Sequence, residues 1–183
     1  MTTPSRPTTE REALGQYQPG APITPTGDPL TSGLGPSAWA ERADRPDLTY
    51  HGEPKIVPMR VAQNFYVEPR DPDPRGMPVL GLDGMAAGTV VDLWVDRAEP
   101  QVRYLEIELA GGAGRTVLMP MTVCKVHGRK GVVMTKSIRG SQFVHVPGVR
   151  NPDLVTLLEE DKIMAFFAGG YLYATPERAR PLV

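Results

Sequence analysis

Proline makes up ten of the first sixty residues of this chain. Because proline lacks a backbone N–H and restricts the residue before it, neither a regular helix nor a central strand fits this stretch. We expect a flexible polar tail over residues 1–20 and an extended, irregular strap over residues 21–60, ordered because Trp39 and the apolar run "KIVPM" anchor it. The backbone groups of such a strap need partners on the surface it covers. The regular domain is therefore confined to residues 61–183.

From about residue 61 the sequence changes to short apolar runs separated by glycine and proline. The runs have the length and alternation of β-strands: "NFYVEP", "MPVLGLDG", "GTVVDLWVD", "VRYLEIEL", "RTVLMPMTVCKV", "GVVMTKSI" and "QFVHVPGV". They predict a mainly β domain, a small antiparallel barrel or sandwich. The apolar spacing then becomes helical in "NPDLVTLLEEDKIMAFFAGGYLY", which predicts a short C-terminal helix that ends near Gly169-Gly170.

Residues 88–109 predict a β-hairpin with an unusual number of carboxylates. In its first strand, alternation directs Val91, Leu93 and Val95 toward the core. The opposite face and the connection carry these side chains: Asp92, Trp94, Asp96, Arg97, Glu99, Arg103, Tyr104, Glu106 and Glu108. One interpretation is a face that meets water. The other is a group of carboxylates with spread pKa values that passes protons through water, and the residues leave both open.

The charges of the chain are balanced in total but not in distribution. There are 20 basic and 21 acidic side chains, so the net charge gives no reason to expect nucleic acid as a partner. No acidic residue lies between Glu108 and Asp153, whereas these basic residues do: Arg115, Lys125, Arg129, Lys130, Lys136, Arg139 and Arg150. Such a block either orients the domain against a charged surface or forms ion pairs within the chain. We favour internal pairing and solvation.

The sequence lacks familiar catalytic and metal-binding motifs. A single Cys124 excludes an internal disulfide and is expected to be a small buried apolar side chain. His51, His127 and His145 are widely separated and have no cysteine pair beside them, so we expect no metal site. The stretch "GGAGRT" at 111–116 predicts a tight hairpin turn, because it lacks the lysine and helix of a phosphate loop. We expect neither a transmembrane helix nor a signal peptide, since no suitable apolar run is present.

Five stretches occur in one order between about residues 20 and 175: "APITPTGDPLTSGLGPSAWAER", "HGEPKIVPM", "GTVVDLWVD" followed by "VRYLEIEL", "LMPMTVCKV", and "VTLLEEDKIMAFFAGGYLYA". Together they resemble the H subunit of the purple-bacterial photosynthetic reaction centre, in its cytoplasmic PRC-barrel portion. The resemblance implies a non-catalytic subunit that caps the L and M subunits on the cytoplasmic face of the photosynthetic inner membrane. Such a subunit stabilises the core, shields the quinone region and relays protons to the secondary quinone.

The resemblance also implies roles for individual residues. Asp96 and Glu99 match the family's proton-transfer residues, with Glu99 expected as the inner member of the relay. His51 matches a residue at which protons are taken up from the surface, which suits a side chain that titrates near neutrality. Arg103 matches a basic residue at the interface beside them, and Asp92 is a weaker candidate for the relay.

Two positions depart from the family's proton-uptake cluster. Where the family has a second histidine and an aspartate, this chain has Glu53 and Thr49. We expect Glu53 to accept protons still, with a different pH response. On the strap, Trp39 is expected to anchor the chain to its partner subunits.

The resemblance assigns all cofactors to the partners: bacteriochlorophyll, bacteriopheophytin, quinones and non-haem iron, with none on this chain itself. Family members normally begin with a transmembrane helix, so we expect a separate small transmembrane anchor, and antenna proteins are a further candidate partner. Two alternatives belong to other classes. One is a stand-alone PRC-barrel adaptor for a protein or RNA, which the basic block favours. The other is a hydrolase using Asp96 and Glu99, which lacks any recognisable nucleophile, oxyanion device or metal ligand set.

Overall fold

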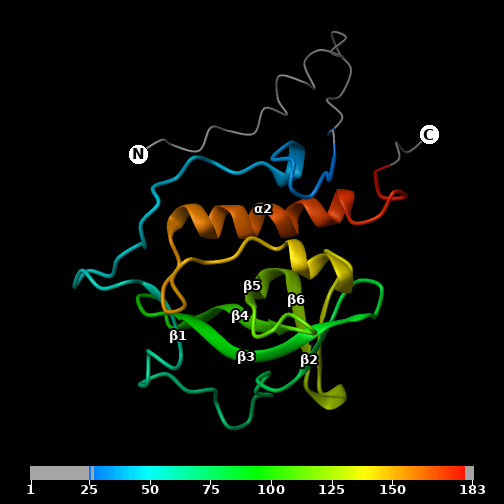
Figure 1. The fold of residues 1–183 in the computed structure, drawn as a ribbon. Helices are drawn as coiled ribbons and strands as arrows, with labels where there is room; N and C mark the ends of the chain where they lie inside the picture. The colour runs from blue at the N-terminus through cyan, green and yellow to red at the C-terminus, as the bar shows by residue number, and fades with distance from the viewer. Residues whose placement is uncertain (1–24, 26, 180–183) are drawn as a thin grey trace.

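The structure is a computed structural model that describes residue 25 and residues 27–179. The described residues form three layers, in which one helix lies between a curled β-sheet and the strap (Figure 1). The strands are β1 (Ile56–Pro58), β2 (Pro78–Leu80), β3 (Ala86–Asp96), β4 (Gln101–Leu109), β5 (Thr116–Pro120), β6 (Cys124–His127) and β7 (Val132–Thr135). The helix is α2 (Leu157–Tyr173), and the short 3-10 turns are η1 (Gly35–Ser37), η2 (Met121–Val123), η3 (Gly128–Lys130) and η4 (Gly140–His145). The predicted mainly β fold with a short C-terminal helix is confirmed.

The strands form one sheet in the order β5-β4-β3-β2-β7-β6, with β1 added to β3. Neighbouring strands in this sheet are antiparallel except for β2 and β7, which run parallel. Irregularities at Val91 and Arg103 each insert one residue into the β3–β4 pairing, which raises the local twist and helps the sheet to curl. The predicted tight turn joins β4 to β5, where Gly111 and Gly114 adopt positive φ angles.

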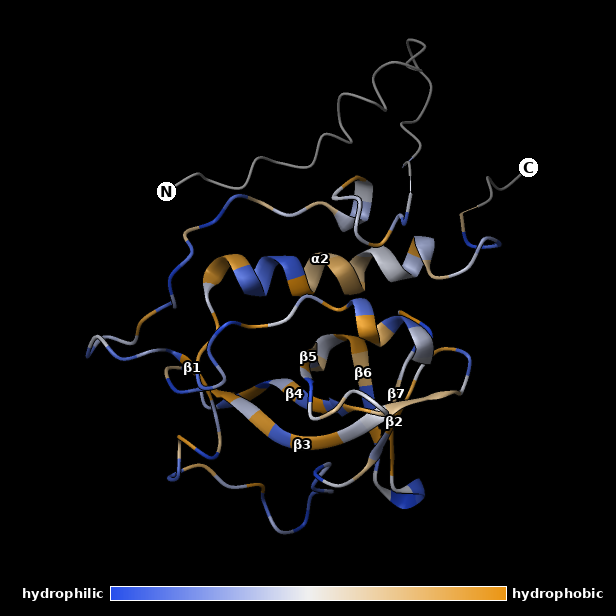
Figure 2. Ribbon diagram, in the orientation of Figure 1, coloured by the Kyte–Doolittle hydropathy of each residue, from blue (hydrophilic) through white to orange (hydrophobic). Residues whose placement is uncertain are grey.

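The sheet and α2 share one hydrophobic core. Its largest fully buried side chains include Trp94, Leu93, Leu105, Ile107, Phe143 and Phe167. Phe143 and Phe167 meet edge to face with ring centroids 5.9 Å apart, which fastens α2 to the η4 turn. Figure 2 shows hydrophobic residues recurring along β3, β4 and α2. The helix is therefore part of the barrel's core and not an appendage to it.

Of the two interpretations of the acidic face of the hairpin, the one in which it meets water is wrong for most of its members. Asp92, Asp96 and Glu106 are buried, and Trp94, expected on the same face, is completely inaccessible. The irregularity in the β3–β4 pairing leaves Val91, expected in the core, as an exposed side chain. The face is buried because β1 pairs with β3 and the residues after β1 continue across it. Glu108, farther along β4, is exposed as expected.

The helix does not end at its two glycines, contrary to the sequence prediction. It begins at a capping box formed by Thr156 and Glu159 and continues through both glycines to Tyr173. A Cβ atom on Gly169 would lie 2.0 Å from the Oγ atom of Ser37, and one on Gly170 would lie 2.4 Å from the Oγ atom of Ser137. The glycines therefore serve close packing, with the strap on one side of the helix and the barrel on the other.

The segment assigned to the strap divides into two parts in the structure. Residues 33–40 lie along the outer side of α2 (Figure 1), whereas Ile56–Pro58 already form a strand of the sheet. Ala40 donates its backbone N–H to the Asp161 carboxylate at 2.7 Å, so part of the strap finds hydrogen-bond partners within its own chain. The sheet thus begins before residue 61.

The glycine contact predicts a specific loss of stability. In Gly169→Ala the new methyl group would collide with Ser37, so we expect the free energy of unfolding to fall by about 1–3 kcal/mol. Ser37→Gly removes the colliding atoms, and the double variant should recover more than half of the loss. Gly148→Ala, where a Cβ meets no atom within 4 Å, is the control. Urea unfolding measures all four, and strictly additive single losses would contradict the contact.

Candidate functional site

The candidate site is one end of the barrel, where the β3–β4 turn lies beside a short hairpin of residues 47–55. Leu48 and Pro54 form a β-bridge, and the backbone N–H of Thr49 bonds to the carbonyl of Glu53 at 2.8 Å. The backbone N–H of Arg97 donates to the carbonyl of Lys55 at 2.9 Å and joins the hairpin to the end of β3. We call this end of the molecule the acidic tip. Residues far apart in the sequence meet there.

Asp96 is the fixed centre of the acidic tip. Its Oδ1 atom accepts the backbone N–H groups of Ala98 and Glu99 at 2.9 and 3.1 Å, which closes the turn after β3. Its Oδ2 atom lies 3.5 Å from Nζ of Lys55 and has no hydrogen bond of its own. The residue is only 1% exposed, so Lys55 supplies the counter-charge that a buried carboxylate requires.

The other predicted relay residues lie around Asp96 with greater exposure. Glu53 pairs with Arg97 at 3.3 Å, and Arg97 also donates to the carbonyl of Pro54. Glu99 is exposed and accepts a 3.4 Å hydrogen bond from Gln101. His51 is exposed at the end of the hairpin, where its ring meets that of Tyr50 at a centroid distance of 5.5 Å. The structure therefore brings Glu53 and Glu99 to the turn that Asp96 closes, with Asp96 buried and Glu99 at the surface of the isolated chain, and it places His51 on the same hairpin as Glu53.

Asp92 belongs to a different cluster. Arg60 approaches its Oδ2 atom to 3.1 Å and Oε2 of Glu106 to 2.6 Å. The indole N–H of Trp94 donates to the same Glu106 oxygen at 2.9 Å, and Arg60 also reaches Asp153 at 3.1 Å. The sequence reasoning missed Arg60, whose one signal was its position directly after the apolar run "KIVPM". Asp92 is thus held in a closed ion-pair cluster under the residues that follow β1.

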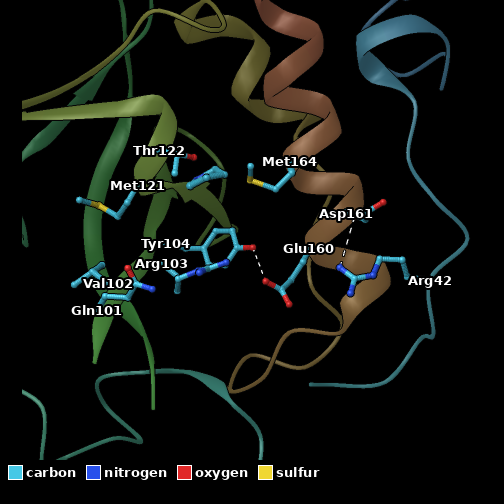
Figure 3. Close-up of a pocket in the computed structure, with 11 residues that line it drawn as sticks. Arg42, Gln101, Val102, Arg103, Tyr104, Met121, Thr122, Glu160, Asp161 and Met164 are labelled. Carbon is cyan, nitrogen blue, oxygen red and sulfur yellow. Dashed lines mark hydrogen bonds and ion pairs between the residues drawn. The ribbon is translucent and has the colours of Figure 1, made fainter. Parts of the chain in front are cut away.

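Arg103 lies beside a pocket between β4 and the beginning of α2 (Figure 3). The pocket has a volume of about 380 Å³. Inside it the Tyr104 hydroxyl donates to Oε2 of Glu160 at 2.7 Å, and Arg42 of the strap approaches Asp161 to 3.9 Å. Burial raises the pKa of Glu160, although the Tyr104 hydrogen bond and the charges of Arg103 and Arg42 oppose the shift. The sequence reasoning missed Glu160 because a carboxylate at a helix start is ordinarily a cap.

Trp39 is half-buried between the strap and α2. Its ring lies against Gly33, and the Lys162 ammonium sits 5.8 Å from the ring centroid. Trp39 therefore anchors the strap to the helix of its own chain, and its expected contact with partner subunits stays a prediction.

Two family models match the chain. The model of the photosynthetic reaction centre H-chain N-terminal region matches residues 2–61, which include the strap, β1 and the hairpin with His51 and Glu53. The PRC-barrel domain model matches residues 68–142, which include β2 to β7 and the turn with Asp96 and Glu99. The two matches follow one another and together cover both halves of the acidic tip. The chain is an H-subunit-type protein. It is a subunit of a photosynthetic reaction centre, a membrane-associated complex, and its family is a structural one that associates with the reaction-centre core.

The H-subunit-type chain shows little sign of reactive or metal-binding groups in its described part. Cys124, expected to be a small buried side chain, is half-buried in the structure, where burial raises its pKa to about 12 and makes the thiol unreactive. Among residues 25 and 27–179, no group of three or more His, Cys, Asp or Glu side chains could hold a metal ion. In the same residues, no helix has the length and apolar character needed to span a bilayer.

The Lys55 link predicts the stability of the acidic tip. Lys55→Met would leave the buried Asp96 carboxylate without its counter-charge, so we expect a loss of about 1–3 kcal/mol in unfolding free energy. Asp96→Asn in the same background should recover most of it, because the amide oxygen still accepts the two backbone N–H groups. Lys125→Met, at an exposed lysine, is the control and should change stability by under about 0.5 kcal/mol. If Lys125→Met lowered the unfolding free energy by a similar amount, the contact of Lys55 with Asp96 would not be the cause of the loss.

The raised pKa of Glu160 predicts how stability depends on pH. Because the folded state favours the protonated carboxyl, its stabilisation is complete below the ordinary glutamate pKa of about 4.3 and is lost as pH rises through the raised pKa. Glu160→Gln should therefore gain stability relative to the unmodified chain across that window and keep the gain at neutral pH. Urea unfolding between about pH 4 and pH 8 measures the difference. Glu108→Gln, at an exposed carboxylate, should show none.

Proposed function

We propose that this H-subunit-type chain caps the cytoplasmic face of the L and M core, shields the quinone region from water and relays protons to the secondary quinone. The observation that carries the proposal is the convergence of the residues 47–55 hairpin and the β3–β4 turn at one end of the barrel. The chain carries out no reaction of its own in this role. The pigments, quinones and non-haem iron belong to the partner subunits.

The relay follows from the exposure of the groups at the acidic tip. His51 and Glu53 lie at the surface, where they would exchange protons with water, and Glu53 also forms an ion pair with Arg97. Glu99 is exposed on the same tip and has no ion pair among the described residues, so its carboxylate is available to a partner surface. Water linking these carboxylates would carry protons between them. Docking on the core would exclude bulk water from Glu99 and make it the inner member.

Asp96 acts in this proposal as an organiser and not as a free shuttle. Its turn holds Glu99 in place, and its Lys55 link holds the hairpin with His51 and Glu53 against β3. Arg103, the exposed third residue of β4, offers a positive charge to the same interface. A separate small transmembrane anchor would hold the complex in the photosynthetic membrane.

Glu99→Gln tests the relay in the assembled reaction centre. We expect the second proton-coupled electron transfer to the secondary quinone to slow by roughly tenfold, because one proton carrier is lost while neighbouring carboxylates remain. Primary charge separation should be unchanged, since it involves no proton. Absorbance changes after two flashes, followed across the pH range, report both steps. Glu108→Gln at the other end of β4 is the matched control, and unchanged kinetics in Glu99→Gln at every pH would exclude Glu99 from the relay.

A further inference from the structure

The basic block between Glu108 and Asp153 is only partly used within the chain. Arg150 pairs with Asp44 at 2.5 Å and with Glu159 at 3.3 Å, as internal pairing predicted. Arg115 donates to the backbone carbonyls of residues 144 and 146. The cations on the β6–β7 hairpin behave differently, since no ion pair to them is found among the described residues. They are Lys125, Arg129, Lys130 and Lys136, all exposed.

Two of these cations, Lys125 and Lys136, lie close to the β6–β7 pair. Lys125 is directly opposite Met134 on one face of the β6–β7 pair, and Lys136 follows Met134 by two residues, just past the end of β7. Both lysines line one groove, so their like charges repel one another. His127, two residues after Lys125, adds a third titratable nitrogen group to this face. The arrangement leaves positive charge that an anionic group would stabilise.

A groove accompanies the charge. It has a volume of about 530 Å³, and its apolar side chains are Leu82, Val123, Cys124, Met134 and Tyr171. Tyr171, near the end of α2, is 53% exposed, so part of its ring is available to a ligand in the groove. Lys125, His127 and Lys136 line the same groove. We call it the cationic groove, and its lining suits a ligand with acidic groups and at least one apolar side chain.

The cationic groove lies away from the acidic tip. The tip is where β1 pairs with the end of β3, whereas β2 and β7 separate β6 from β3 in the sheet order. β6 is also the last strand in the sheet order, and β7 is its one partner within residues 25 and 27–179. An edge strand of this kind offers backbone hydrogen bonds to an extended segment. Lysine on an edge strand also discourages uncontrolled strand addition, so a suitable segment has to bring negative charge.

We propose that the cationic groove binds an extended acidic segment of a partner protein. Carboxylates of the segment would lie on Lys125 and Lys136, and an apolar side chain would fill the floor beside Tyr171. A peptide fits better than a bilayer surface because the groove is concave and has an apolar floor. The residues of the groove are also separate from those of the tip that we assign to the membrane-embedded core. The proposal is therefore independent of the proton relay.

A labelled peptide tests the groove in the full chain. The probe is a fluorescein-labelled peptide of about ten residues, the length of a strand with its flanks, in which Asp and Glu alternate with Leu and Tyr. We expect saturable binding by fluorescence anisotropy that weakens as salt rises. Lys125→Glu with Lys136→Glu should weaken binding by about tenfold or more. Tyr171→Ala should weaken it without changing its salt dependence.

A charge-matched control separates the groove from general attraction. Arg45→Glu with Arg70→Glu makes the same change in net charge at exposed arginines outside the groove and should alter binding by less than about twofold. Equal loss in both double variants, or no binding of the peptide at low salt, would overturn the proposal. Vesicles containing phosphatidylglycerol form a second arm. If they bind in a Lys125- and Lys136-dependent manner while the peptide does not, the groove recognises a lipid surface and the proposal is wrong.

Discussion

Arg60 places its guanidinium between carboxylates of β3 and β4, and much of the fold depends on that contact. Two buried carboxylates side by side repel each other, and removing them from water is costly unless a cation compensates them. Arg60 supplies the cation, while Trp94 gives Glu106 a further hydrogen bond. The second face of the hairpin can therefore be covered by the chain after β1 instead of by water. Because both faces of β3 are packed, its last residue, Asp96, is held in a fixed position. The turn that carries Glu99 is bonded to Asp96 and is therefore held in place as well.

The arrangement in layers explains why both family matches are needed to describe one molecule. The barrel supplies the β3–β4 turn, and the preceding segment supplies β1, the hairpin and the strap. α2 lies between them and contacts both: Phe167 enters the core, while Gly169 receives Ser37 of the strap. The acidic tip is therefore a joint product of two sequence regions. Neither region alone would bring Lys55 to Asp96.

Local sequence patterns predicted the secondary structure correctly wherever it depends mainly on residues close together in the chain. The alternating runs indicated the strands, the glycine-rich stretch indicated the β4–β5 turn, and the helical spacing indicated α2. The errors came from contacts between distant segments. The alternation of residues along β3 could not reveal that Arg60 covers Asp92. Two adjacent glycines ordinarily end a helix, but here Gly169 is needed because Ser37 of the strap approaches the helix closely. The residues of the acidic tip were chosen through a family resemblance, whereas the Lys55 contact and Glu160 required three-dimensional structure.

The packing of the strap against α2 has a consequence for the order in which the chain folds. Ala40 bonds to Asp161 across a separation of 121 residues, and Ser37 fits a notch that exists only when the helix is formed. Contacts between residues so distant in sequence are slow to form, because a large loop has to close first. During synthesis the strap leaves the ribosome early, yet its docking surface is made near the end. The strap therefore cannot dock before the helix has formed, so its closure over α2 follows the formation of the helix.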